Sequence, residues 1–155
     1  MAADAKFAIK DAVGKQLLSP VTVSEELEQK FVKKARSSSI KLVPISIIVS
    51  VVILTIAVLL VIFLNRVVFS AIGIIAVFFP FYAIYDMFAT GKALKNHDYE
   101  FLTGEVIGKT DNGNYIIRGL EGLPIAIMFG KKEYNPGETA IVARVKDDLN
   151  LISEE

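Results

Sequence analysis

The side chains that could take part in chemistry are few in this chain of 155 residues, and they lie far apart in sequence. Asp86 closes a long apolar stretch, where a carboxyl group can relay protons or simply be hydrated at the boundary, and we interpret it as a boundary residue. His97 is the single histidine, and one imidazole without neighbouring ligands does not make a metal site. Lys131, Lys132 and Glu133 form a charged run that is typical of a solvated loop.

Other kinds of catalytic and binding site also lack their residues. Cysteine is absent, which excludes disulfides, thiol catalysis and cysteine-ligated zinc. The sequence contains no glycine-rich phosphate loop and no pair of carboxylates at a catalytic spacing. Residues 98–155 carry 6 basic and 11 acidic side chains, a balance that argues against nucleic acid as a partner. We therefore expect a protein that is not an enzyme and that holds no cofactor or metal.

Two apolar segments, 42–64 and 67–88, dominate the middle of the chain. A hydrocarbon core about 30 Å thick requires roughly 20 apolar residues in a helix, and each segment supplies them without a charge before Asp86. Only Asn65 and Arg66 separate the two segments. The sequence therefore predicts a transmembrane hairpin of two helices over residues 42–88, which makes the chain an integral membrane protein.

Away from the boundary residue Asp86, the interiors of these segments are apolar except for four small hydroxyl side chains. They are Ser46, Ser50, Thr55 and Ser70. A conduction pathway would place ionisable groups at depth, so we do not expect transport by this chain alone. Ser46 and Ser50 are small residues one turn apart, a spacing that lets helices approach closely, either within the hairpin or between copies in a homo-oligomer.

Basic residues flank the hairpin on one side. Residues 30–41 contain five basic side chains and no acidic one, and Lys92 and Lys95 follow the second segment. The turn between the segments holds only Arg66. The positive-inside rule therefore predicts that both termini are cytoplasmic. The same basic cluster could also attract anionic lipids, but setting the orientation is the simpler interpretation.

Residues 1–41 are expected to form a cytoplasmic region of short helices. The first helix, within residues 1–20, has a loose apolar pattern that Pro20 ends, and it could pack as an ordinary helix or lie on the membrane surface. The second begins at a Thr22 cap, with Glu25 completing a capping box. The serines at 37–39 should then end this helix in a short flexible joint before the membrane.

A polar linker over 89–97 leads to a region, 98–155, in which apolar residues alternate with period two. We expect strands there over 101–107, 115–118, 123–129, 139–145 and 149–152. Five such short strands favour a small closed barrel, because closure removes exposed strand edges. The expected fold is therefore a membrane α-helical hairpin followed by a C-terminal all-β barrel. A core this small would gain stability from docking on partners or on other copies.

Three stretches of this region share turn and strand punctuation with a known family: 103–106, 113–117, and 134–145 together with Leu149. They resemble the small OB-like barrel of NfeD-type membrane proteins, in which membrane helices precede the barrel. The chain departs from that family in having two spanning segments where the family commonly has more, and in its added N-terminal helices. The resemblance implies a noncatalytic protein of the bacterial cell membrane that works beside stomatin- or flotillin-like scaffolds in membrane organisation or quality control.

The layout predicts a membrane-anchored adaptor or scaffold whose cytoplasmic barrel binds other proteins. The alternative is an auxiliary subunit of a transporter or channel complex, in which the hairpin packs against a pore-forming partner. The expected partners are accordingly membrane lipids, other membrane proteins, including the scaffold that the resemblance implies, and further copies of the chain.

Overall fold

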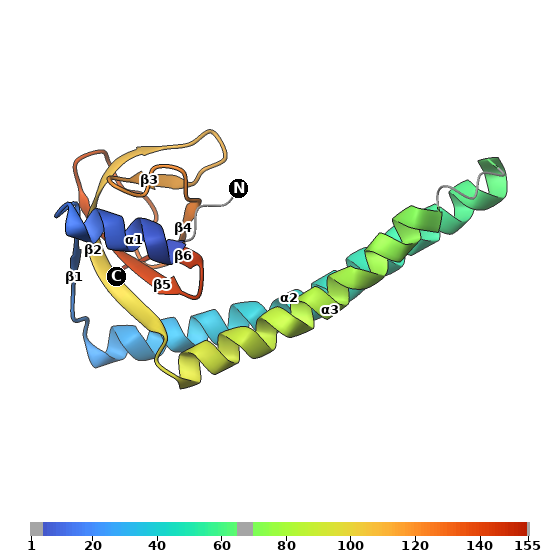
Figure 1. Cartoon of the computed structure of the whole chain (residues 1–155), viewed down its shortest axis with the longest axis horizontal. Helices are drawn as coiled ribbons and strands as arrows, with labels where there is room; N and C mark the ends of the chain where they lie inside the picture. Colours follow the sequence, from blue (N-terminus) through green and yellow to red (C-terminus); the bar gives the residue numbers. More distant parts are fainter. Residues whose placement is uncertain (1–4, 65–69, 155) are drawn as a thin grey trace. The chain divides into compact units, whose positions relative to one another are not determined.

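The computed structural model describes residues 5–64 and 70–154, which form three helices and six strands (Figure 1). In chain order the elements are α1 (Ala5–Gly14), β1 (Leu18–Pro20), α2 (Glu25–Leu64), α3 (Ser70–Lys95), β2 (Tyr99–Lys109), β3 (Tyr115–Ile117), β4 (Ile125–Phe129), β5 (Thr139–Val145) and β6 (Asp148–Ile152). The chain divides into two compact units. We name Met1–Lys34 with Ala93–Glu155 the barrel unit and Ala35–Lys92 the hairpin unit.

The five predicted strands are confirmed, and they close into a barrel. Neighbouring strands follow the order β2-β3-β4-β6-β5, and β5 pairs back onto β2. The first part of β2 pairs with β5 from Tyr99 opposite Val145 to Glu105 opposite Thr139. Its last part, from Val106 to Lys109, pairs with β3, with a register shift between Val106 and Gly108. One strand of 11 residues thus has two partners in succession, which is how so short a sheet closes.

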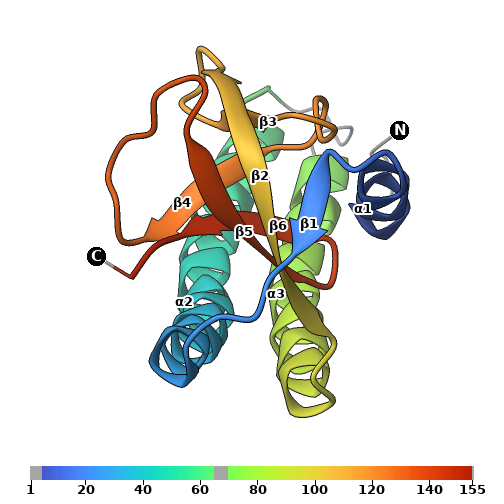
Figure 2. The same cartoon turned by 90° about the vertical axis from the view of Figure 1, so that its left-hand side faces the viewer.

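A sixth strand, β1, comes from the N-terminal region and was not predicted. Leu18 lies opposite Gly104 and Pro20 opposite Leu102, so β1 extends the sheet along a free edge of β2 (Figure 2). The prediction that Pro20 ends a helix here is wrong. Proline is tolerated in β1 because an edge strand does not need every backbone donor.

Helix α1 packs on the barrel through its apolar side. Ala5, Ile9 and Ala12 are buried and belong to the same core cluster as Leu18 and Leu102. The alternative of a membrane-surface helix is therefore wrong for this face, because the barrel already covers it.

The expected division of the chain at residues 41 and 98 differs from the compact units. The N-terminal elements belong to the barrel unit, since β1 pairs with β2 and α1 shares its core. The sequence could not show this, because the contacts join residues more than 80 positions apart.

Helix α2 begins at another cap and continues past the expected joint. Ser24 rather than Thr22 caps it, since the Ser24 hydroxyl accepts a hydrogen bond from the Leu27 amide at 3.3 Å. The helix then runs unbroken through the serines at 37–39, so the flexible joint is wrong. Ala35 and Ser39, one turn apart, are both buried, and packing of that face outweighs the weak helix preference of serine.

Helix α3 likewise includes most of the residues expected to form a linker over 89–97. It ends only at Lys95, and Ala93 and Leu94 in its last turn are buried. Burial of this turn explains why the polar composition of the segment did not break the helix. The predicted turn at Asn65 and Arg66, and the predicted start of the second segment at residue 67, lie outside the described residues.

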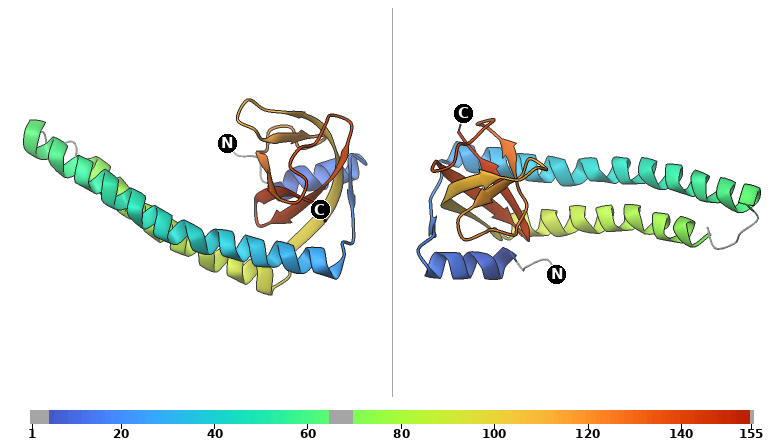
Figure 3. Two further views of the ribbon diagram at one scale, coloured as in Figure 1. Left: turned by 180° about the vertical axis from the view of Figure 1, so that it is seen from behind. Right: turned by 90° about the horizontal axis from the view of Figure 1, so that it is seen from above.

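Within the hairpin unit, the parts of α2 and α3 between residues 35 and 92 run side by side (Figure 3). The Ser50 hydroxyl on α2 donates a hydrogen bond of 2.7 Å to the Ala76 carbonyl on α3. Gly73 has no side chain to hold the helices apart, and a Cβ atom there would lie 3.4 Å from Leu54. Both helices are long and apolar enough to cross a membrane, as predicted.

The placement of β1 can be tested at Gly104. A Cβ atom at this position would lie 2.5 Å from a Leu18 methyl group and 2.7 Å from one of Ile117. We expect Gly104→Ala to lower the free energy of unfolding of the barrel by about 1–3 kcal/mol, because the added methyl overpacks the junction of β1, β2 and β3. Urea unfolding of the full chain in detergent measures this.

The matched control is Gly108→Ala on the same strand. There the nearest atom, on Ile116, is 3.8 Å away, which is an ordinary contact. Gly108→Ala should leave the unfolding free energy within about 0.5 kcal/mol of the parent chain. Equal losses from the two variants would show that β1 does not seat against Gly104.

Candidate functional site

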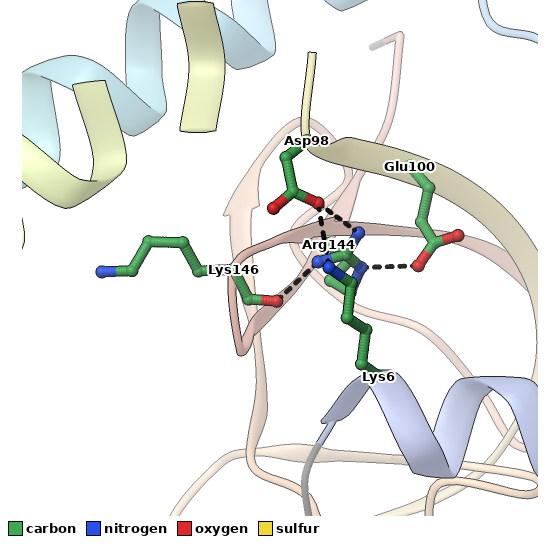
Figure 4. Close-up of polar contacts among 5 residues, drawn as sticks. All are labelled: Lys6, Asp98, Glu100, Arg144 and Lys146. Carbon is green, nitrogen blue, oxygen red and sulfur yellow. Dashed lines mark hydrogen bonds and ion pairs between the residues drawn. The ribbon is translucent and has the colours of Figure 1, made fainter. Parts of the chain in front are cut away.

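A buried arginine organises the polar residues at the start of β2. Arg144 on β5 is only 4% exposed and lies directly opposite Glu100 of β2. Its guanidinium group donates to the Glu100 carboxylate at 2.5 Å, to the Asp98 carboxylate at 3.1 Å and to the Lys146 carbonyl at 2.7 Å (Figure 4). Lys6 of α1 donates to the same Asp98 oxygen at 3.3 Å. The cluster therefore joins α1, β2 and β5.

The charges in this cluster balance one another. The hydrogen bond from Arg144, followed by that from Lys6, holds the pKa of Asp98 below its usual value. Burial disfavours the charge on Arg144, but its hydrogen bonds to Glu100 and Asp98 more than compensate and raise its pKa. Two cations thus face two carboxylates. A guanidinium that stays charged does not exchange protons, so the arrangement is suited to holding three elements together.

A second cluster forms around Tyr99, at the first residue of β2. Its hydroxyl donates a hydrogen bond to the Glu28 carboxylate in the first turns of α2. Its ring packs against Phe31, which is fully buried, and against Phe101, with centroids 5.9 Å and 5.8 Å away. Burial and the adjacent Glu28 carboxylate raise the pKa of Tyr99 to about 12, so the phenol is neutral at physiological pH. These contacts attach the N-terminal part of α2, residues 25–34, to the barrel; we call this part the root of α2.

His97 lies two residues beyond the end of α3 and caps this helix. It has a positive φ of 53°, its amide donates to the Leu94 carbonyl, and the Asp98 amide donates to the Ala93 carbonyl. This pair of bonds is the Schellman motif, which usually has glycine at the position of His97. The His97 Nδ1 atom lies 3.0 Å from the Tyr99 hydroxyl. Because that hydroxyl gives its one hydrogen to Glu28, the bond between them requires the hydrogen on Nδ1.

The candidate functional residues named from the sequence lie in different parts of the structure and do not form a common site. Asp86 lies, partly exposed, on α3 in the hairpin unit. His97 is a helix cap that contacts Tyr99. Lys131 is on the surface, as expected, but it is not simply solvated: it forms an ion pair of 2.7 Å with Glu138. Hydrogen bonds from Lys131 and Asn135 lower the pKa of Glu138 to about 2. Within the described residues, no three potential metal ligands are gathered into a group.

Sequence reasoning missed both clusters, although one signal was present. Arg144 interrupts the apolar run 140–145, and a charge inside a strand that is otherwise buried requires a partner. Asp98, directly before β2, and Glu100 within it are two residues apart, a spacing that puts both side chains on one side of the extended chain. Nothing in the sequence indicated that Glu28 would reach Tyr99, 71 residues away.

The geometry defines a small closed barrel joined to two helices that are long and apolar enough to cross a membrane. No family model, no curated protein and no solved structure matches this chain. The resemblance to NfeD-type proteins therefore remains a prediction from the sequence.

Removing Arg144 should destabilise the barrel. Arg144→Gln leaves Asp98 and Glu100 without their buried cation, and we expect a loss of about 2 kcal/mol, below the value for a fully buried pair because both carboxylates are partly exposed. Hydrogen exchange of the β2 and β5 amides in the full chain reports this loss.

Arg118→Gln is the matched control, because Arg118 pairs with Glu105 on the surface. It should cost less than about 1 kcal/mol. If exchange quickened equally in both variants, the Arg144 cluster would have no special part in holding β2 to β5.

The burial of the Tyr99 hydroxyl can be tested by measuring its pKa. The difference between the alkaline absorbance titrations of the parent chain and Tyr99→Phe isolates this phenol, and we expect a midpoint near pH 12 rather than 10. Because the folded-state pKa is raised, the contribution of this phenol to stability is complete below pH 10 and is lost as the pH rises toward 12. Glu28→Gln should move the midpoint down, since it removes the adjacent negative charge. A difference titration centred at pH 10 in the parent chain would contradict the burial of Tyr99.

Proposed function

We propose that this chain is a noncatalytic, membrane-anchored adaptor, in which the hairpin unit crosses the membrane and the barrel unit binds other proteins at the cytoplasmic face. The observation that carries the proposal is the exposure of apolar side chains along both long helices. Only 11% of the most apolar stretch of 18 residues in α2, and 17% of the corresponding stretch in α3, is buried. Ile48 and Phe81, for example, are 64% and 65% exposed. The core helices of a soluble protein bury such side chains, whereas a bilayer accommodates them.

The polar groups within the hairpin unit support the same environment. Ser50 donates to the Ala76 carbonyl across the hairpin, while Ser46 and Thr55 donate to carbonyls of their own helix. Backbone and hydroxyl groups must be satisfied internally in hydrocarbon, since no water is present to replace the missing partner. The apolar length also fits, because residues 42–64 in a helix span about 34 Å at ~1.5 Å per residue.

The orientation rests on charge. Lys41 and Lys92 lie at the same end of the hairpin unit as its two chain ends, and by the positive-inside rule that end faces the cytoplasm. The barrel unit contains residues on both sides of the hairpin, so it too is assigned to the cytoplasm. The resemblance to NfeD-type proteins further suggests an OB-like barrel, a bacterial cell membrane and a stomatin- or flotillin-like scaffold as partner.

The barrel unit is suited to docking because it is fixed to the roots of both helices. Residues 25–34 of α2 and 93–95 of α3 belong to it, and Tyr99 contacts both Glu28 and His97. A partner that binds the barrel unit would therefore be tethered to the membrane by the chain connections at residues 34–35 and 92–93. A further copy of the chain is another candidate partner, since the barrel core is small.

One observation favours the alternative of an auxiliary subunit of a transporter or channel. A shallow apolar groove of about 430 Å³ lies on the hairpin unit, with Ala57 and Gly73 among its lining residues. Small residues allow a further transmembrane helix to approach closely. In this alternative the hairpin, not the barrel, contacts the partner.

Site-specific photo-crosslinking in native membranes separates the two functions. A photoreactive residue at Asp111 or Lys132 probes exposed positions of the barrel unit, and one at Ile62 or Ile74 probes the groove. The adaptor predicts discrete protein adducts from the barrel positions and lipid adducts alone from the groove. The auxiliary subunit predicts the reverse, with adducts to a polytopic protein from the groove.

The same membranes test the anchor and its orientation. The chain should resist carbonate extraction, and because it has no native cysteine, single cysteines report topology cleanly. An impermeant maleimide should label Asn65→Cys in intact cells and leave Lys132→Cys unlabelled until lysis. Labelling of Lys132→Cys from outside would overturn the cytoplasmic placement, and release by carbonate would overturn the membrane anchor itself.

A further inference from the structure

A proline interrupts the hydrogen bonding of α3 within the hairpin unit. Pro80 lies inside α3, and proline has no amide hydrogen to donate to the carbonyl four residues earlier. Its ring also crowds that carbonyl, which belongs to Ala76. The Ala76 carbonyl therefore lacks the helical hydrogen bond that it would otherwise accept. In hydrocarbon, where no water replaces the missing donor, such a carbonyl is costly.

The missing donor comes from the other helix. The Ser50 hydroxyl of α2 donates to the Ala76 carbonyl at 2.7 Å, and the two residues are 4% and 0% exposed. Ser46 and Thr55, in contrast, donate to carbonyls of α2 itself. The bond from Ser50 thus joins α2 to α3 at the carbonyl that Pro80 leaves without its helical donor.

The part of α3 beyond Pro80 packs through the same face of the helix. The residues of this face follow one another at spacings of three and four, and all are buried or partly buried: Ala76, Pro80, Ala83, Met87 and Thr90. Thr90 is 3% exposed, and its hydroxyl oxygen has no hydrogen-bond partner among the described residues. A buried hydroxyl without a partner disfavours the packed state, because it can form a hydrogen bond once it leaves that state.

We infer that Pro80 is a hinge in α3 and that the Ser50 hydroxyl is the latch that holds this hinge closed. The inference rests on the proposed membrane anchor, because an apolar environment is what makes the unpaired carbonyl costly. Proline weakens α3 at this level, and the Ser50 bond favours the packed state. The unpaired Thr90 hydroxyl favours release of residues 81–92. Two opposing contributions of this kind make the segment bistable.

Release of the segment would have a consequence beyond the hairpin unit. The segment ends at Lys92, and the chain enters the barrel unit at Ala93. A change at the hinge would therefore be passed along the chain to the barrel unit, which is the part of the proposed adaptor that binds other proteins.

Distances between spin labels in the full chain, reconstituted in phosphatidylcholine vesicles, test the hinge. Because the chain has no native cysteine, labels can be attached at two introduced cysteines. Leu42→Cys with Tyr85→Cys reports the part of α3 beyond Pro80, and Val52→Cys with Ile74→Cys reports the part before it. All four labelled positions are exposed. The parent chain should give one narrow distance distribution for each pair.

Ser50→Ala should raise the population of longer distances for the pair beyond Pro80 by roughly three- to tenfold, the range expected for one hydrogen bond between membrane helices. The pair before Pro80 should not change. Adding Pro80→Ala should restore the narrow distribution, because the new amide donates to the Ala76 carbonyl within α3. Adding Thr90→Val to Ser50→Ala should also lower the population of longer distances, since it removes the unpaired hydroxyl.

Ser46→Ala and Thr55→Ala are the matched controls, since each removes a hydroxyl that bonds within α2. Neither should change the distances of either pair. The inference is wrong if Ser50→Ala leaves the distances unchanged, if it broadens both pairs equally, or if Pro80→Ala does not restore the parent distribution. In a chain that resists carbonate extraction, these outcomes contradict the hinge alone. A chain that carbonate releases from native membranes contradicts the proposed function.

Discussion

The barrel unit depends on one constraint: β2 must serve several partners along its length. Its first half pairs with β5 on one edge and receives β1 on the other, and its second half turns to β3. Its start is also where the polar contacts converge, since Tyr99 reaches Glu28, and Arg144 holds Glu100 and the preceding Asp98. Displacing the start of β2 would therefore open the barrel and release the root of α2 together. Charge balance around Arg144 and the neutral phenol of Tyr99 keep this junction closed at physiological pH.

The hairpin unit differs from the barrel unit because its apolar side chains are exposed rather than buried. Its side chains point outward and are apolar, while its few hydroxyls, such as those of Ser50 and Thr55, turn back to backbone carbonyls. This pattern is stable where the surroundings offer no hydrogen bonds, and it would be costly in water. The chain thus combines a unit whose stability comes from burying a core with one whose exposed surface is matched to lipid. In the proposed adaptor, the barrel unit is the part that binds other proteins.

Much of the fold could be predicted because its signals are local. The five barrel strands follow from period-two alternation, and the two apolar helices follow from uninterrupted hydrophobic runs. The errors arise where distant packing decides. Pro20 predicts a helix end, yet it lies in an edge strand because Leu18 finds a place beside Gly104. The serines at 37–39 predict a joint, yet burial of Ala35 and Ser39 keeps α2 continuous. Arg144, a charge inside an apolar strand, was the one feature of the sequence that indicated a buried polar cluster.

The sequence by itself determined which segments are strands and which are apolar helices, and how charge is distributed on either side of the hairpin. These properties depend on the order of neighbouring residues, which a single chain displays in full. Only the tertiary structure decided that the N-terminal residues belong to the barrel unit and that Glu28 and His97 both contact Tyr99. It also decided that the Arg144 guanidinium pairs with the Glu100 carboxylate. Such contacts join residues tens of positions apart, and their free energy exists only once the chain has closed on itself.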